Sequence, residues 1–431
     1  MNDGPVDPPK APLRPVHDGR GAVVAGTWVA LRNNMFLSFW VFSFIAFIGA
    51  SMQTVGAGWL MVSLGGSPFQ VSLIQGVMSL SVMLVGLLSG VLADLYDRRL
   101  IMLVALTGLM AATGTIGLLA FSGGLSPLNL LSITFLFGLA SSGMTPAMQS
   151  TLPDLVPLDD LPSAVTLNGM SSSAARSVGP AFAGALIGTI GAGATLMLNA
   201  LAFVGLWIIV ARWRDHKRVA PVGNVRIVEA LSAGLQFAWR DRQFRSLLLQ
   251  VLAGFFGVSA VLGLLPSFVV SHYGDRQSAA AQHLGVLMSC YGIGSVLGAL
   301  AVAPFTRRFN RMRLVWAATA LCGVCMLLLV AANNSVMLGI AMVGAGFSWS
   351  VALTCINISA QLLLPRDLLA RGLSLSMVAL MVALAAGSVV WGAVATVLSV
   401  ERAIGIAGTV AIVWVLIQFL RPYFSVKGQS Q

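Results

Sequence analysis

The sequence predicts an all-α membrane protein with twelve transmembrane helices, and three observations predict it. Only 9% of the 431 residues are charged, and they gather in short gaps between long apolar runs. Each run offers about 18 or more mostly apolar residues, enough for a helix to cross a bilayer core of about 30 Å. Finally, the second half of the chain repeats features of the first half at one fixed offset.

The apolar runs are predicted to be helices because backbone groups inside a bilayer must pair with one another. Only helices and closed barrels achieve this. Barrel strands alternate apolar and polar residues, and these runs do not alternate. The predicted helices span roughly 35–57, 70–93, 100–121, 125–148, 164–189, 193–211, 245–270, 283–305, 314–332, 335–360, 372–396 and 403–420.

The distribution of Lys and Arg predicts the orientation in the membrane, since short cytoplasmic loops retain these residues. With the N-terminus inside, 22 of the 25 basic residues fall in cytoplasmic segments, and only Arg276 and Arg402 fall outside. We therefore expect both termini in the cytoplasm of an inner or plasma membrane. The net charge of +11 is explained by contact with anionic lipid. Nucleic-acid binding is the rival explanation, and we expect none.

An offset of 208 residues aligns several features of the two halves. It aligns Gly90 with Gly298, Arg99 with Arg307, Pro157 with Pro365, Gly179 with Gly387 and Gly184 with Gly392. Two parallel six-helix repeats are typical of one large class of transporters, with the substrate site between the halves near the midplane.

The repeat and the charges predict five segments. They are a disordered cytoplasmic tail (1–34), a first six-helix half (35–211), a cytoplasmic linker with an amphipathic helix (212–244), a second six-helix half (245–421) and a short cytoplasmic tail (422–431).

The loop between the second and third helices concentrates charge in the sequence GVLADLYDRRL (90–100). Asp94 ends a helix and needs compensation there. Its natural partners are Arg98, Arg99 or the positive N-terminus of the eleventh predicted helix (372–396) in the other half. A contact between the halves would exist only when the cytoplasmic side is closed, so we expect Asp94 to act in gating. The alternative is an interfacial carboxylate that only marks topology.

The fifth helix carries the sequence RSVGPAFAGALIG (176–188). Gly179 and Gly184 permit close helix packing and Pro180 permits a kink. Such packing also suits a tight seam between the halves. Arg176 is the only deep basic residue, so it needs a partner. Either Asp154 or an anionic substrate could supply one.

These segments resemble known motifs. Residues Gly90, Asp94, Asp97, Arg98 and Arg99 resemble motif A of the major facilitator superfamily, and Gly179, Pro180 and Gly184 resemble its antiporter motif. The stretch 145–170 followed by Arg176 looks like the exporter branch that includes enterobactin exporters and macrolide efflux proteins. The resemblance covers nearly the whole chain. It departs at Leu95, where a basic residue is usual, and at Val302, which aligns with Asp94.

Uncharged polar residues within the runs predict a substrate cavity: Gln53, Gln75, Gln149, Asn168, Asn357 and Gln361. Aromatic residues that could stack on a bulky ligand are Trp59, Phe255, Phe256, Tyr291, Trp349 and Trp391. Each of them taken alone is better explained by packing. Together they favour a large amphipathic substrate that is uncharged or weakly anionic.

The sequence gives no indication of an enzyme. It has no Ser-His-Asp set, phosphate loop or zinc-ligand spacing, and its four cysteines lie within apolar runs, where thiols are typically inert. We therefore expect no cofactor, no bound metal and no ATP-driven step. No acidic residue falls near a helix midpoint, so the usual carboxylate proton carrier is missing.

The sequence thus predicts a monomeric exporter that works by alternating access. We expect proton coupling and a siderophore, drug or similar substrate. An importer or facilitator of small metabolites is the alternative with the same fold. A membrane sensor or assembly partner that transports nothing is the alternative from a different class.

The orientation can be tested with single cysteines in a background that lacks the native ones. Ser67→Cys and Ser126→Cys should react in intact cells with a reagent that cannot cross the membrane. Asn310→Cys should react only after the cells are opened. Labelling of Asn310→Cys in intact cells would contradict the predicted topology.

Overall fold

The structure, a computed structural model, describes residues 28–95, 97–213, 240–274, 277–364 and 369–420. This part of the chain forms twelve long α-helices and no strand, as predicted. The first half contains α2 (Asn34–Ser63), α3 (Pro68–Leu95), α4 (Arg98–Ser122), α5 (Pro127–Leu155), α6 (Leu161–Ile190) and α7 (Ala192–Arg212). The second half contains α9 (Arg242–Tyr273), α10 (Gln277–Arg308), α11 (Arg311–Ala331), α12 (Ser335–Leu363), α13 (Leu369–Val397) and α14 (Val400–Leu420). The predicted tails and linker helix lie largely outside the described residues, so their boundaries remain predictions.

Short polar side chains in the connections set where many helices begin. The first N–H groups of a helix have no partner within it, and an Asn, Asp or Ser side chain just before the helix can accept from them. Asn33 accepts from the backbone N–H of Met35 and Phe36. Ser126, Asp241, Asn310 and Asn334 cap α5, α9, α11 and α12 in the same way.

The helix boundaries confirm the internal repeat. Helices α2, α5, α6 and α7 begin at residues 34, 127, 161 and 192, whereas α9, α12, α13 and α14 begin at 242, 335, 369 and 400. Each pair of starts differs by 208 residues, the offset expected from the sequence. The two halves therefore have the same order of helices.

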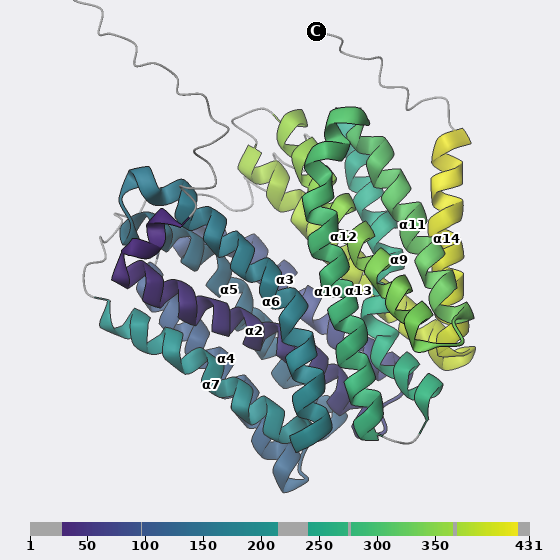
Figure 1. The fold of residues 1–431 in the computed structure, drawn as a ribbon, viewed down its shortest axis with the longest axis horizontal. Coiled ribbons are helices and arrows are strands. Elements are labelled where there is room, and N and C mark those ends of the chain that lie inside the picture. The colour runs from purple at the N-terminus through teal and green to yellow at the C-terminus, as the bar shows by residue number, and fades with distance from the viewer. Residues whose placement is uncertain (1–27, 96, 214–239, 275–276, 365–368, 421–431) are drawn as a thin grey trace, which may run out of the picture.

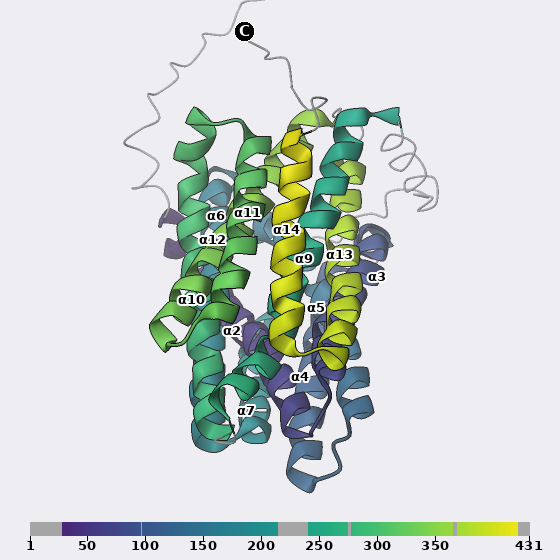
Figure 2. The ribbon, with the colours of Figure 1, turned by 90° about the vertical axis from the view of Figure 1, so that its right-hand side faces the viewer.

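Two helix pairs make the most extensive contacts between the halves: α3 packs against α13, and α6 packs against α10. Because α10 repeats α3 and α13 repeats α6, the two contacts are equivalent to one another. They imply an approximate two-fold axis between the halves. Figure 2 shows α14 on the outer side of the second half.

We call the end of the molecule where α2 begins and α14 ends the termini end, and the opposite end the hairpin end. The two groups of helices meet toward the hairpin end and splay apart toward the termini end (Figure 1). The contacts across the seam agree. Near the start of α3, Ser72 Oγ donates to the backbone oxygen of Ser388 in α13 at 2.8 Å. A Cβ added to Gly285 of α10 would lie 2.6 Å from Gly184 Cα of α6.

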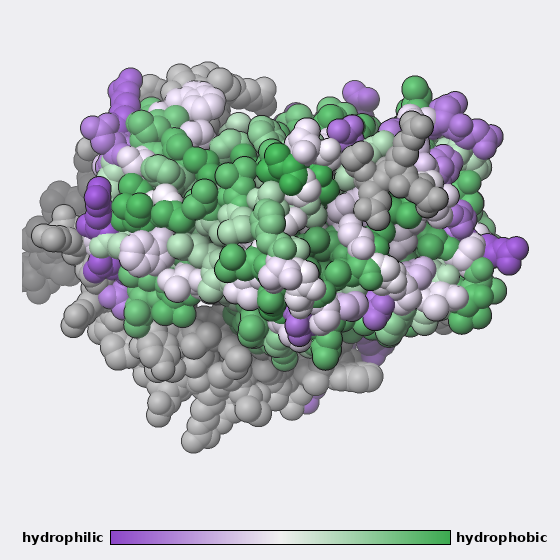
Figure 3. Space-filling view, turned by 90° about the horizontal axis from the view of Figure 1, so that it is seen from below, coloured by the Kyte–Doolittle hydropathy of each residue, from purple (hydrophilic) through white to green (hydrophobic). Residues whose placement is uncertain are grey.

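Eleven helices within the described residues are long and apolar enough to span a membrane. The exception is α6, in which only Val178–Ile190 forms a short apolar segment. The first half of α6 carries Ser, Thr and Asn residues instead. Large apolar side chains such as Leu118, Leu201 and Leu300 are exposed on other helices, as expected for surfaces that face lipid. Seen from the hairpin end, apolar residues cover much of the surface and hydrophilic ones lie mainly toward the edges (Figure 3).

The seam between α6 and α10 can be tested with Gly184→Ala. The added methyl group would meet the backbone of Gly285 (N at 2.9 Å) and of Ala281 (O at 3.0 Å), so the helices must separate. Spin labels at Gly124→Cys and Asn333→Cys should report a longer distance across the hairpin end. Gly143→Ala is the matched control, since a Cβ at Gly143 meets nothing within 4 Å. An unchanged distance in folded Gly184→Ala would mean that this contact does not hold the seam closed.

Candidate functional site

A groove of about 620 Å³ lies between the termini end and the seam. Residues of three helices of the first half line it: Phe47, Ala50, Ser51 and Thr54 of α2, Gln149 and Leu152 of α5, and Val165, Asn168, Gly169 and Ser172 of α6. Thr54 also lines a smaller cavity together with Leu262 and Pro266 of α9. The groove therefore reaches the interface between the halves.

The structure brings two of the predicted cavity residues together and separates the others. Gln149 and Asn168 both line the groove. Gln75 lines the smaller cavity and donates from Nε2 to Ser79 Oγ at 3.2 Å. Asn357 and Gln361 are exposed on α12. Gln53 is fully buried, and neither polar atom of its side chain has a hydrogen-bond partner among the residues that the structure describes.

Three groove residues with short side chains, Ser51, Thr54 and Ser172, were not predicted from the sequence. A signal was present, because the lining positions of α2 and of α6 recur three and four residues apart, the spacing of one helix face. Short hydroxyl residues within apolar runs resemble ordinary packing residues, however. Nothing in the sequence shows which face of a helix is turned toward a cavity.

The groove offers hydrogen-bonding groups that the protein leaves unused. Within the described part of the chain, the side chains of Ser51, Thr54, Gln149 and Asn168 make no hydrogen bond. None of the ten lining residues carries a formal charge. An unpaired polar group under an apolar ligand is unfavourable, so this surface favours a ligand that has hydroxyl, carbonyl or amide groups of its own.

The predicted aromatic residues pack mainly within the second half. Phe255 and Trp349 meet edge to face at 4.8 Å between ring centroids. Trp391 donates from Nε1 to the backbone oxygen of Phe256 at 2.8 Å. Trp59 and Trp391 are almost fully buried. These rings contribute to packing in this conformation.

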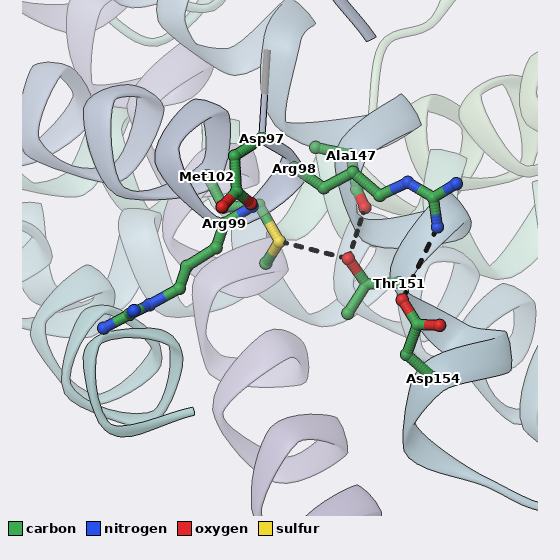
Figure 4. Close-up of polar contacts among 7 residues, drawn as sticks. All are labelled: Asp97, Arg98, Arg99, Met102, Ala147, Thr151 and Asp154. Atoms are coloured by element: carbon green, nitrogen blue, oxygen red, sulfur yellow. Dashed lines mark hydrogen bonds and ion pairs between the residues drawn. The ribbon is translucent and has the colours of Figure 1, made fainter. Parts of the chain in front are cut away.

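The charged residues after α3 hold the first half together at the termini end (Figure 4). Asp97 caps α4 by accepting from the Arg99 backbone N–H at 2.9 Å. The Arg99 side chain donates to the backbone oxygens of Val210 (3.1 Å) and Ala211 at the end of α7. A cation beside the last carbonyls of a helix is favourable because those groups carry partial negative charge.

Arg98 points to the other side, toward α5, where its Nη1 lies 3.5 Å from Asp154 Oδ2 (Figure 4). Asp154, which the sequence offers as a partner of Arg176, pairs with Arg98 in the structure. The side chains of Asp94 and Arg176 lie outside the described ones, as does the loop 365–368 before α13. The predicted roles of Gly90 and Asp94 in gating therefore remain predictions.

The glycines of the predicted antiporter motif, which lies in α6, are in close contact with neighbouring helices. A Cβ at Gly179 would lie 2.6 Å from Ser51 Cβ of α2. The backbone oxygen of Pro180 lies 3.1 Å from a Cβ built on Gly285. Gly188 meets Gln282 of α10. The glycines thus allow close contacts on both sides of α6, including the contact with α10 of the second half.

Two repeated six-helix halves, a groove that reaches their interface and a seam at one end define a membrane transporter of the major facilitator type. The chain belongs to the family described as transmembrane secretion effectors, which it matches over residues 25–428.

Named relatives and solved structures agree with this assignment. The chain is 20% identical to the staphyloferrin A transporter of Staphylococcus aureus over 72% of its own length and 77% of that protein. It is 28% identical to the multidrug efflux pump Tap of Mycobacterium tuberculosis over 62% of its own length, a match that spans 64% of the pump. The nucleoside transporter NupG has the same fold, with a TM-score of 0.73 and 14% identity over 90% of this chain and 98% of that one. A bacterial homologue of the human lysosomal transporter Spinster, solved in an inward-facing and unoccupied conformation, has a TM-score of 0.70. It is 17% identical, and the match covers 90% of this chain and 95% of that one.

The contacts of Arg99 predict a larger effect on stability than the ion pair of Arg98. Arg99→Gln removes a charged donor from the α7 carbonyls, and such hydrogen bonds contribute about 1.5–3 kcal/mol. Asp154→Asn breaks a partly exposed pair, worth about 0–1 kcal/mol. Thermal unfolding of the purified variants in detergent should show a clearly lower Tm for Arg99→Gln. Equal Tm values for the two variants would contradict the role given to Arg99.

Proposed function

We propose that this protein is a secondary active exporter of the inner or plasma membrane that works by alternating access. The observation that carries the proposal is a substrate-sized groove on the termini-end side of a seam closed at Gly184 and Gly285. With the termini in the cytoplasm, as the basic residues predict, this conformation would load substrate from inside the cell. Export then requires the seam to open and the termini end to close.

The proposed substrates are siderophores, drugs or similar bulky amphipathic molecules. The names of the relatives support this class, since one is a siderophore transporter and another a multidrug efflux pump. The groove supports it as well, because its volume of about 620 Å³ falls in the range of pockets that hold drug-sized ligands. Protons are the proposed coupling ion, membrane lipid the other partner, and the monomer the functional unit.

Transport direction can be measured in inverted membrane vesicles with an imposed pH gradient, acid inside. Vesicles containing the protein should accumulate erythromycin or a catecholate siderophore above the level of control vesicles. An uncoupler that collapses the gradient should abolish the difference. Accumulation only in right-side-out vesicles would favour an importer, and no transport in either would favour a sensor or assembly partner.

Arg176 is proposed to contact anionic substrate, since residue 176 follows the groove-lining Ser172 by about one helical turn of α6. Arg176→Lys should retain part of the transport of an anionic siderophore, and Arg176→Gln almost none, because only the first keeps the positive charge. Transport of a neutral drug should fall much less in either variant. Loss of both variants from the membrane would indicate structural pairing and would contradict the substrate role.

A further inference from the structure

The residues that line the groove differ in chemistry from their repeat partners in the second half. The 208-residue offset pairs Ser51 with Ser259, Thr54 with Leu262, Asn168 with Ser376 and Ser172 with Leu380. The first member of each pair lines the groove. The second member belongs to α9 or α13 of the other half.

One pair shows directly that repeat partners face each other. Thr54 of α2 and Leu262 of α9 line the same small cavity between the halves. This placement follows from the approximate two-fold axis, which brings equivalent positions together where the halves meet. At this point the first half presents a hydroxyl group and the second half an apolar side chain.

Two further pairs differ in the same direction, whereas Ser172 Oγ in the groove already donates to the backbone oxygen of Gly169 at 3.1 Å. Ser51 and Asn168 have no hydrogen-bond partner within the described residues. Ser259 Oγ donates to the backbone oxygen of Phe256 at 2.7 Å, and Ser376 Oγ donates to that of Gly372 at 3.1 Å. Both of these hydroxyl groups are buried and already committed to their own helices. Asn357, the exposed repeat partner of Gln149, is the exception on the second half.

We infer that the groove binds an amphipathic molecule in one orientation, with its hydroxyl, carbonyl or amide groups against α2, α5 and α6 and its apolar face toward the second half, where Leu262 of α9 lies opposite Thr54. The inference rests on the proposed function only in taking the groove as the substrate site. A ligand that is polar on all sides would lose hydrogen bonds to water where it meets the second half. An entirely apolar ligand would leave the polar side chains of α2, α5 and α6 without hydrogen-bond partners.

The repeat supplies a matched pair of variants for the test. Ser51→Ala and Ser259→Ala make the same chemical change at equivalent positions, and each serine lies beside an equivalent glycine, Gly179 or Gly387. The probes are erythromycin, which carries sugar hydroxyl groups on a largely apolar ring, and tetraphenylphosphonium, which has no hydrogen-bonding group. Binding to purified protein is measured at equilibrium, and each variant is checked for an unchanged Tm.

Erythromycin should bind Ser51→Ala and Thr54→Val about 2- to 10-fold more weakly than the unaltered protein, the range for one neutral hydrogen bond. Ser259→Ala should bind it unchanged. Leu262→Ala should weaken the binding of both probes, whereas tetraphenylphosphonium should bind Ser51→Ala and Thr54→Val unchanged.

Equal weakening of erythromycin binding by Ser51→Ala and Ser259→Ala would overturn the inference, as would no weakening by Ser51→Ala and Thr54→Val. Failure of the unaltered protein to bind erythromycin would overturn it too, because an amphipathic groove should accept this probe. Binding at equilibrium does not depend on transport direction. Evidence that the protein is an importer would therefore contradict the proposed export. It would not affect the inference that the ligand's polar groups face the first half and its apolar face the second.

Discussion

The close approach of α6 and α10 is the contact on which the arrangement of the halves depends. Apolar side chains gain little by leaving lipid for another helix, so helix association in membranes relies on close packing and hydrogen bonds. Gly184 and Gly285 allow backbone to meet backbone, and a Cβ on either would collide with the other helix. The equivalent seam between α3 and α13 adds the hydrogen bond from Ser72 to Ser388. Together these contacts close one end and leave the groove on the other side.

The described charges that follow α3 at the termini end organise the first half. Arg99 holds the end of α7, and Arg98 reaches α5 at Asp154. The repeat partner of Arg98 is Thr306, and that of Asp154 is Leu362. The second half therefore cannot form the same ion pair. The two halves share the same order of helices but differ in the charged residues at equivalent positions.

The same divergence extends into the groove. In the first half, Ser51 and Asn168 line it and make no hydrogen bond within the described residues, whereas their repeat partners Ser259 and Ser376 bond to their own helices. Leucine replaces threonine at the point where the halves meet. The helices are thus related by an approximate two-fold axis, whereas the described lining of the groove belongs to the first half alone. Such a site can distinguish the two faces of one ligand, which a symmetric site could not do.

Local patterns in the chain were sufficient to predict the helices, the repeat and the close-packing role of Gly184, because the bilayer restricts spanning segments to apolar helices and close contacts to small residues. Residue patterns could not show that Gln53 is buried, that Thr54 and Ser51 line the groove, or that Asp154 pairs with Arg98. Helical spacing defines a face, but the packing of other helices determines what that face meets. The choice of closed end likewise depends on contacts between residues more than 100 positions apart, such as Gly184 and Gly285. Only the folded arrangement of the two halves brings those residues together.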